Sequence, residues 1–167
     1  MRDDLPLKVT HEVRHRCLCL HLQRAARAIA RRFDDALRPH GLTNGQFSLL
    51  MALNRPHPPC IGEIASLLAM DRTTLTANLK PLERRGLIEI IVDSEDRRSR
   101  RLKLSDDGRD VLVCALQVWR DTHDEIDKLL GETRPDRIRA DLLALWGCIT
   151  CVQHNLFAPP IGQNCFT

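Results

Sequence analysis

The chain has 167 residues, the size of one domain or of a small module with helical extensions, and is too short for most two-domain enzymes. Hydrophobic residues make up 43% of it and charged residues 28%, which excludes a disordered or fibrous chain. The formal net charge is only +3, but it is concentrated. The window 70–104 holds nine Lys and Arg against six Asp and Glu, and the rest of the chain sums to zero.

The cysteines and the two ends of the chain indicate the cellular compartment in which we expect the protein. Seven cysteines are present, but their odd number and the lack of a secretion signal argue against a disulfide framework. The N-terminus is charged from Arg2 onward and has no apolar signal core. Residues 142–167 lack charges, yet their polar residues and prolines argue against a membrane span. We therefore expect a cytoplasmic protein with reduced thiols, no cofactor and no membrane partner.

A long amphipathic helix is expected over about residues 12–38, because apolar residues recur there at steps of three and four. Its inward side chains are Leu18, Leu22, Ala25, Ile29, Phe33 and Ala36. Pro39 and Gly41 end this helix. Thr43 begins the next helix, since Gln46 three residues later completes a capping box.

Two short helices and a β-hairpin are expected after a proline-rich loop over residues 54–59. The apolar residues of the two helices are Ile61, Ile64 and Leu68, then Leu75, Leu79 and Leu82. Asp71 caps the second helix and Gly86 ends it, while Pro81 inside it should kink the helix or move its end. Apolar and charged residues then alternate around a charged turn at 93–98, which predicts two antiparallel strands. The inward strand residues are Ile88, Ile90, Val92, Leu102 and Leu104.

Two long helices complete the expected layout. Ser105 caps the first, whose inward residues are Val111, Ala115, Val118, Thr122, Ile126 and Leu129. Residues 131–135 break the helix, with Pro135 suited to a first helical position. The last helix carries apolar residues at alternating steps of four and three: Ile138, Leu142, Leu145, Ile149, Val152 and Leu156. This heptad seam requires a partner helix.

A short helix, a tight turn, a second helix and a basic hairpin together make a winged helix-turn-helix. The second helix fits the DNA major groove, and the basic turn fits the adjacent minor groove. The candidate DNA contacts are Arg72, Thr73, Thr74, Thr76, Ala77, Asn78, Lys80, Asp96, Arg97, Arg98 and Arg100. Arg72 is placed to make a bidentate contact with a guanine, while the threonines are placed to contact phosphates or a thymine methyl. Arg101 and Lys103 are expected along the DNA backbone. Alternatively, the basic run is only a solvated strand face.

Several short motifs in this region carry a family resemblance. They are Leu42-Thr43, Gln46-Phe47, Ile64-Ala65, residues 73–82, Arg85-Gly86-Leu87-Ile88, Asp96-Arg97-Arg98, Leu102, Leu104, Ser105 and Gly108. With these, the chain resembles the MarR family of bacterial transcriptional regulators from about residue 18 to 130. The resemblance implies that Asp96 holds the wing-tip arginine in place. The chain departs from the family at Cys60, where relatives more often carry Ser or Thr as a helix cap.

The resemblance implies a mainly α fold with a small β-hairpin. A winged helix-turn-helix DNA-binding domain would occupy residues 42–104, between an N-terminal dimerisation helix at 1–41 and C-terminal dimerisation helices at 105–158. A tail would follow at 159–167. It also implies an obligate homodimer whose two winged modules bind a pseudo-palindromic operator in double-stranded DNA. No glycine-rich phosphate loop or nucleophile elbow is present, so we expect no enzyme. A non-DNA adaptor dimer is the remaining rival, and such a protein would not need the basic hairpin.

Members of the family usually repress transcription and are released by a small molecule, often an aromatic acid. The candidate wall residues of an effector cleft are His21, Phe47, Met51 and Trp119, with Arg24 or Arg27 as the carboxylate partner. Alternatively, the apolar residues belong to the core and the arginines are solvated.

Thiol-based redox sensing is a second possibility. Cys19 lies at the approximate position of the peroxide-reactive cysteine in one branch of the family, with Cys17 beside it. That branch activates its thiol with tyrosines, which this chain lacks, and a buried cysteine acting as a small hydrophobe is the commoner state. A metal site is the weakest reading, because the spacing of its candidate ligands matches no standard zinc motif. Those ligands are His15, Cys17, Cys19, His21, Cys148, Cys151 and His154.

Overall fold

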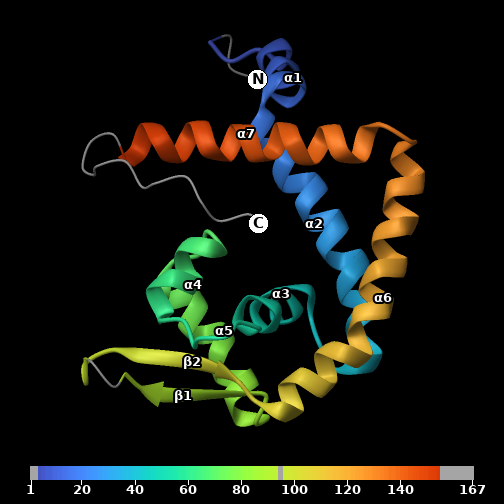
Figure 1. Ribbon diagram of the computed structural model, residues 1–167. Helices are drawn as coiled ribbons and strands as arrows, with labels where there is room; N and C mark the ends of the chain where they lie inside the picture. The colour runs from blue at the N-terminus through green and yellow to red at the C-terminus, as the bar shows by residue number, and fades with distance from the viewer. Residues whose placement is uncertain (1–3, 94–95, 155–167) are drawn as a thin grey trace. The chain divides into compact units, whose positions relative to one another are not determined.

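A computed structural model describes residues 4–93 and 96–154, in which seven α-helices accompany one two-stranded antiparallel sheet (Figure 1). The chain divides into two compact units, Met1–Thr122 and His123–Thr167, with helix α6 (Asp106–Leu130) contributing to both. None of the described helices combines the length and apolarity needed to cross a bilayer. The mainly helical architecture with one hairpin confirms the expected fold class.

The N-terminal segment forms two helices where the sequence predicts one. Helix α1 spans Leu7–Arg16 and α2 spans Leu18–Leu37, with extended backbone at Cys17 between them (φ −71°, ψ 99°). The Cys17 thiol accepts a hydrogen bond from the Leu20 N–H at 3.4 Å and so caps α2. The prediction of a single helix was wrong. Its apolar spacing begins only at Leu18, after the break, and cysteine is not among the preferred capping residues that would have marked a helix start there.

The connection from α2 to α3 follows the sequence signals. A short 3₁₀ turn, Arg38–His40, ends at Gly41, whose φ of +67° requires the left-handed region that glycine adopts freely. Helix α3 (Asn44–Leu53) then begins with the predicted capping box. The Gln46 N–H donates to the Thr43 hydroxyl at 3.2 Å, and the Thr43 N–H donates to the Gln46 side-chain oxygen at 3.0 Å.

The helix-turn-helix consists of α4 (Ile61–Leu67) and α5 (Arg72–Arg84), as predicted. At the start of α4 the carboxylate of Glu63 accepts the Cys60 N–H at 2.5 Å. This hydrogen bond holds the pKa of Glu63 below its ordinary value. Glu63 thereby fixes the start of α4, although Cys60 lacks the capping hydroxyl that a serine or threonine would provide.

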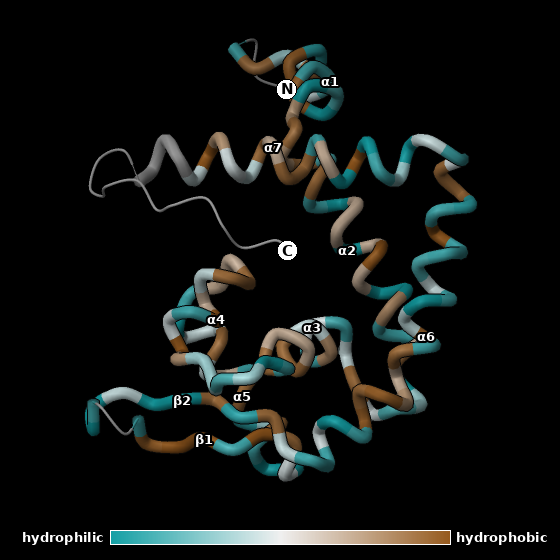
Figure 2. Tube along the Cα trace, viewed as in Figure 1, coloured by the Kyte–Doolittle hydropathy of each residue, from teal (hydrophilic) through white to brown (hydrophobic). Residues whose placement is uncertain are grey.

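Helix α5 is held by its inner face. Leu75, Leu79 and Leu82 are at most 1% exposed, and the helix contacts α3, α4 and the first strand of the sheet. Pro81 lies inside α5, but the helix runs on to Arg84, so the proline does not end it. Other fully buried members of this core are Leu37, Leu49, Leu50, Ile64 and Leu102. Much of α3 and of the first strand is apolar (brown in Figure 2).

The wing is a hairpin of β1 (Ile88–Val92) and β2 (Arg100–Leu104), in a register that pairs Ile88 with Leu104. The Leu102 N–H also donates to the Pro59 carbonyl at 2.9 Å, so the loop before α4 pairs with β2 from its other side. The expected alternation fails at Val92, which is 54% exposed.

A largely buried ion pair fixes the wing where its strands meet the turn. Arg101 Nε donates to Asp93 Oδ2 at 2.7 Å, and the carboxylate side chain is only 7% exposed. A second guanidinium nitrogen of Arg101 donates to the Pro58 carbonyl at 3.1 Å. Lys103 pairs with Glu89 at 3.1 Å, but both of those side chains are about half exposed. Arg101 is therefore a structural residue, and Lys103 forms an exposed surface pair.

The start of α6 packs tightly against the end of the helix-turn-helix. The Ser105 hydroxyl accepts the Gly108 N–H at 3.0 Å and donates to the Gly86 carbonyl at 2.6 Å, which confirms Ser105 as the cap. Gly86 has a φ of +72° and follows the end of α5, as predicted. A Cβ atom placed on Gly108 would lie 2.1 Å from the Leu87 carbonyl oxygen, so this position admits only glycine.

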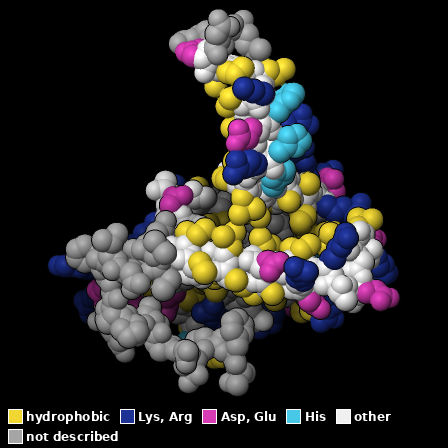
Figure 3. Space-filling model, turned by 90° about the horizontal axis from the view of Figure 1, so that it is seen from above, with side chains coloured by type: hydrophobic (Ala, Val, Ile, Leu, Met, Phe, Trp, Pro, Cys, Tyr) yellow, Lys and Arg dark blue, Asp and Glu magenta, His cyan; other side chains and the backbone are white. Residues whose placement is uncertain are grey.

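The second unit contains the end of α6 and helix α7 (Arg134–His154), separated by Gly131 at a φ of +82°. Leu129 is 86% exposed, so its predicted inward position was wrong. The heptad residues Ile138, Leu142 and Ile149 are between 40% and 49% exposed, and apolar side chains gather along α7 in Figure 3. Leu145 of the same seam is half-buried, while the side chain of Val152 and all of Leu156 lie outside the described residues.

Replacing Gly108 with alanine should destabilise the first unit by about 2 kcal/mol or more, because the added methyl overlaps the Leu87 carbonyl. Urea unfolding monitored by circular dichroism measures this change. Gly45 in α3 provides the matched control, since a Cβ there meets nothing within 4 Å. Gly45→Ala should leave stability unchanged or raise it by about 0.5–1 kcal/mol. Equal urea midpoints of unfolding for Gly108→Ala and Gly45→Ala would contradict the close packing at Gly108.

Replacing Arg101 with methionine should lower the free energy of unfolding by about 1–3 kcal/mol, because a buried carboxylate loses its cationic partner. Lys103→Met removes the same charge from the same strand but breaks only an exposed pair, so we expect a loss of about 0–1 kcal/mol. Thermal unfolding and amide exchange of the hairpin compare the two. If Lys103→Met proved as costly as Arg101→Met, the ion pair would not anchor the wing.

Candidate nucleic-acid interface

The first turn of α5 is organised by its cap, Asp71. The Asp71 carboxylate accepts the Thr74 N–H at 2.8 Å and the Thr74 hydroxyl at 2.6 Å. These bonds, the hydroxyl bond first, hold the pKa of Asp71 below its ordinary value. The helix is therefore capped as predicted, and the hydroxyl of Thr74 is occupied within the protein.

An exposed stripe runs along α5 opposite the buried leucines. Thr73, Ala77, Lys80 and Arg84 follow one another at steps of four, three and four, which places them on one face of the helix. All four are exposed. The sequence interpretation included the first three but missed Arg84, although the same spacing continues to it.

The other candidates on α5 flank this stripe. Arg72 is exposed but lies beside α4, since a Cβ on Gly62 would be 3.3 Å from its Nη2 atom. The Thr76 hydroxyl donates to the Arg72 carbonyl at 2.7 Å. Asn78 is half-buried. The structure therefore brings the predicted residues onto one helix but spreads them over more than one face.

Asp96 organises the tip of the wing through the backbone. Its carboxylate accepts the Arg98 N–H at 2.9 Å and the Ser99 hydroxyl at 2.7 Å, and these bonds hold its pKa below the ordinary value. Asp96 thus holds the main chain at Arg98 rather than its guanidinium. Arg97 and Arg98 are exposed, and over residues 4–93 and 96–154 neither guanidinium has an ion-pair partner.

Most other cations of the hairpin are engaged within the protein. Arg100 donates to the carbonyls of Arg97 and Ser99 at 3.0 and 3.2 Å, so its guanidinium folds back onto the turn. Arg101 and Lys103 are held in the ion pairs described above. The cations left available on this surface of the described chain are Arg72, Lys80, Arg84, Arg97 and Arg98.

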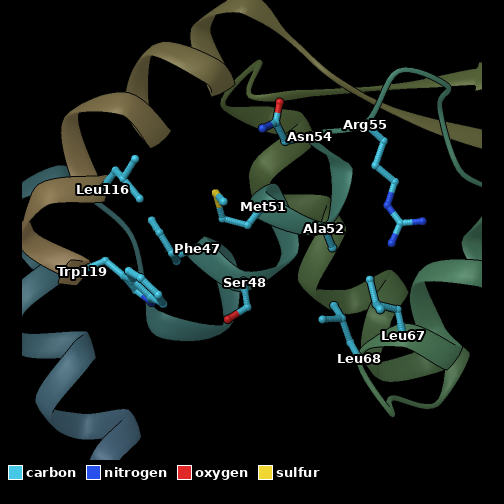
Figure 4. Close-up of a pocket in the computed structure, with 10 residues that line it drawn as sticks. All are labelled: Phe47, Ser48, Met51, Ala52, Asn54, Arg55, Leu67, Leu68, Leu116 and Trp119. Atoms are coloured by element: carbon cyan, nitrogen blue, oxygen red, sulfur yellow. The ribbon is translucent and has the colours of Figure 1, made fainter. Parts of the chain in front are cut away.

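The first unit contains a largely apolar pocket of about 430 Å³, lined by residues of α3, α4, α6 and the loop after α3 (Figure 4). Phe47, Met51 and Trp119 line it, and the rings of Phe47 and Trp119 stack with centroids 6.0 Å apart. The cation that lines the pocket is Arg55. Sequence reasoning missed it, since a single arginine in a loop gives no periodic signal.

The remaining effector candidates lie elsewhere. His21, Arg24 and Arg27 are exposed residues of α2 and are not among the side chains that line this pocket. Arg27 donates to Gln23 at 3.3 Å. The structure therefore groups the predicted apolar wall residues but does not place the predicted carboxylate partners beside them.

The thiols and histidines near the α1–α2 junction do not form a metal site. Cys17 is half-buried, and the exposed Cys19 accepts a hydrogen bond from Gln23 Nε2 at 3.3 Å. His21 Nε2 lies 3.2 Å from the His15 carbonyl oxygen. No group of three or more potential ligands is found among the described residues. The side chains of Cys151 and His154 lie outside that part of the chain.

Comparison with known proteins gives consistent matches. A family profile described as the MarR family matches residues 40–99. The M. tuberculosis transcriptional regulator MosR, solved in complex with DNA, is 35% identical over 81% of this chain and 98% of that one, with a TM-score of 0.72. The transcriptional repressor CouR, solved bound to a 23-mer DNA duplex, is 34% identical over 80% and 92%, with a TM-score of 0.66.

A relative known from its sequence is the transcriptional activatory protein BadR of Rhodopseudomonas palustris. It is 32% identical over 97 residues, which are 56% of this chain and 55% of BadR. The chain thus spans about half the length of that relative, whereas it covers nearly all of the solved MosR chain. On the strength of this coverage, and of a helix-turn-helix with a basic wing, the chain belongs to the MarR family of DNA-binding transcriptional regulators.

Proposed function

We propose that the protein is a sequence-specific repressor that binds a pseudo-palindromic operator as a homodimer and is released by a small aromatic acid. The observation that carries this proposal is the exposed stripe on α5 together with the two available arginines at the wing tip. An exposed helix face of this kind fits the major groove, and two adjacent cations fit a narrow minor groove.

The DNA contacts divide by the chemistry that each side chain offers. We assign Arg97 and Arg98 to the minor groove, with Asp96 shaping the turn, and Lys80 and Arg84 to phosphates. Arg72 reaches a guanine edge from the side of α5, which requires its guanidinium to leave Gly62. Thr73 has its hydroxyl available for a phosphate or a base. Thr76 and Ala77 offer apolar groups on the outer side of α5, while Thr74, Asn78 and Arg100 contribute packing and turn structure.

The proposed partner for dimerisation is a second copy of the chain. Three heptad residues of α7, Ile138, Leu142 and Ile149, are exposed within one copy, and Leu143 and Trp146 beside them are 64% and 47% exposed. A two-fold dimer presents two identical winged modules, so its operator has matching half-sites. The dimerisation helices at 1–41 and 105–158, flanking a DNA-binding domain at 42–104, are part of this proposal.

The direction of regulation is argued from relatives of similar identity. CouR is a transcriptional repressor at 34% identity, whereas BadR is a transcriptional activatory protein at 32%. The likeness to CouR extends over 80% of the chain and that to BadR over 56%. The longer likeness favours a repressor.

The pocket between α3, α4 and α6 supports an aromatic-acid effector. The stacked rings of Phe47 and Trp119 offer flat apolar surface, and Arg55 offers a cation for a carboxylate. An effector acts by binding one conformation of the dimer better than the other. Redox sensing by Cys17 and Cys19 stays a prediction, with the capping bond of Cys17 as the structural feature that oxidation would remove.

Replacing Arg98 with alanine should weaken operator binding and lower the salt slope by about one phosphate per subunit, because one wing-tip cation no longer displaces counterions. Fluorescence anisotropy over a series of salt concentrations measures both. Arg14→Ala, in α1, removes one charge that is also exposed but lies outside the winged module, so it should leave the slope unchanged. An unaltered slope in Arg98→Ala would remove the wing from the interface.

Replacing Arg55 with methionine should abolish the thermal stabilisation that phenolic acids give the wild-type protein, since the carboxylate loses its cationic partner in the pocket. Arg24→Met is the matched control and should respond like the wild type, because Arg24 does not line the pocket. The same acids should release operator DNA from the wild type. Loss of the response in Arg24→Met but not in Arg55→Met would move the site away from this pocket.

A further inference from the structure

Two of the three hydroxyls in the first half of α5 are turned toward the protein. The Thr74 hydroxyl donates to the Asp71 carboxylate at 2.6 Å, and the Thr76 hydroxyl donates to the Arg72 carbonyl at 2.7 Å. A hydroxyl that donates its single proton within the helix has none left for a phosphate or a base acceptor. Among the threonines of α5, only Thr73 retains a free donor in the described chain.

The bond at Thr76 decides which atom of this side chain faces outward. The Cβ atom of threonine carries one hydroxyl and one methyl group, and the hydroxyl here is held against the helix backbone. The methyl group is therefore the part of the exposed Thr76 side chain that this hydrogen bond does not engage. Ala77, the next residue, is also exposed and ends in a methyl group. Thr76 and Ala77 together present an apolar patch on a helix that is otherwise polar on its outer side.

We propose that Thr76 and Ala77 select thymine, through contact of their methyl groups with the thymine C5-methyl in the major groove. This inference rests on the proposed entry of α5 into that groove. The thymine methyl is the one apolar mark that a base pair displays there, and cytosine lacks it. An apolar patch without a free donor cannot recognise the acceptors of guanine. Each half-site therefore contains a thymine at the position that faces Thr76 and Ala77.

The size of the effect follows from the area that each methyl group buries. Removing one buried methyl-sized group costs enough to weaken binding about fourfold. A thymine replaced by deoxyuracil loses only the C5-methyl and keeps its pairing and its hydrogen-bonding edges. Such a replacement at the reading position should therefore weaken binding about fourfold, and elsewhere in the duplex it should have little effect.

The experiment uses the full-length protein and a duplex that the protein itself selects from a random pool. Each thymine of one half-site is replaced singly by deoxyuracil, and affinities are measured by fluorescence anisotropy at fixed salt. Wild-type protein should lose about fourfold at one or two positions. Equal affinity for thymine and deoxyuracil at every position would overturn the inference. Failure to select or bind any duplex would instead overturn the proposed function.

Three variants then assign the effect to the methyl of Thr76. Thr76→Ser keeps the hydroxyl and its bond but loses the methyl, so it should bind the thymine duplex about fourfold more weakly and no longer distinguish deoxyuracil. Thr76→Val keeps the methyl groups and should retain the discrimination. Thr74→Ser is the matched control on the flank of α5 and should behave like the wild type.

Two outcomes of this variant series contradict the assignment. If Thr76→Ser still bound the thymine duplex about fourfold more tightly than the deoxyuracil duplex, Thr76 would not contact the thymine methyl. The same result is expected if deoxyuracil weakens binding only by changing the flexibility of the duplex. Loss of discrimination in Thr76→Val would show that the hydroxyl, not the methyl, is the reading group. These cases are separated by a double-mutant cycle. It compares the loss of affinity on replacing thymine with deoxyuracil between the wild type and each Thr76 variant.

Discussion

The burial of one face of α5 is the constraint on which the rest of the interface depends. Leu75, Leu79 and Leu82 are removed from solvent by α3, α4 and β1, so the helix cannot rotate about its axis. Because the inner face is fixed, the outer face is fixed with it. Thr73, Ala77, Lys80 and Arg84 face outward as a consequence of hydrophobic packing. The orientation of the proposed DNA-contacting side chains is thus set by the buried residues on the opposite face of the helix.

The wing is also held in place by contacts within the protein, but the main contact is between charged side chains instead of leucines. The ion pair of Asp93 with Arg101 and the pairing of β2 with the Pro59 carbonyl hold the hairpin in place next to the loop before α4. The tip then projects Arg97 and Arg98, which have no ion-pair partner in the described part of the chain. The basic residues of the window 70–104 therefore fall into two groups: a structural share held in contacts within the protein, and an available share with no ion-pair partner in the described part of the chain. Only the second share can contribute to counterion release on DNA.

Local signals in the sequence predicted much of this fold. The capping box of Thr43 and Gln46, the cap at Asp71 and the glycine at 86 each depend on a few neighbouring residues. The exceptions need information from the whole fold. The break at Cys17 interrupts no apolar spacing, and the exposure of Val92 follows from where β1 leaves the core. Arg55 lines the pocket only because the loop after α3 passes it.

Hydrogen bonds account for what sequence reasoning could not see at the interface. The sequence shows three threonines near the start of α5, but not that two of their hydroxyls donate internally. It also shows a cluster of basic residues in the hairpin, but not that Arg100 folds back onto the turn. Residue type alone therefore overstated the number of polar groups that are free to contact DNA.

Dimethyl sulfate footprinting of a bound, self-selected duplex tests the central claim, that α5 lies in the major groove, most directly. The reagent methylates guanine N7, which lies in the major groove, and adenine N3, which lies in the minor groove. The account predicts protection of guanine N7 within each half-site, and protection of adenine N3 only at the flanks where the wing tips lie. Full reactivity of every guanine N7 in a bound duplex would contradict it.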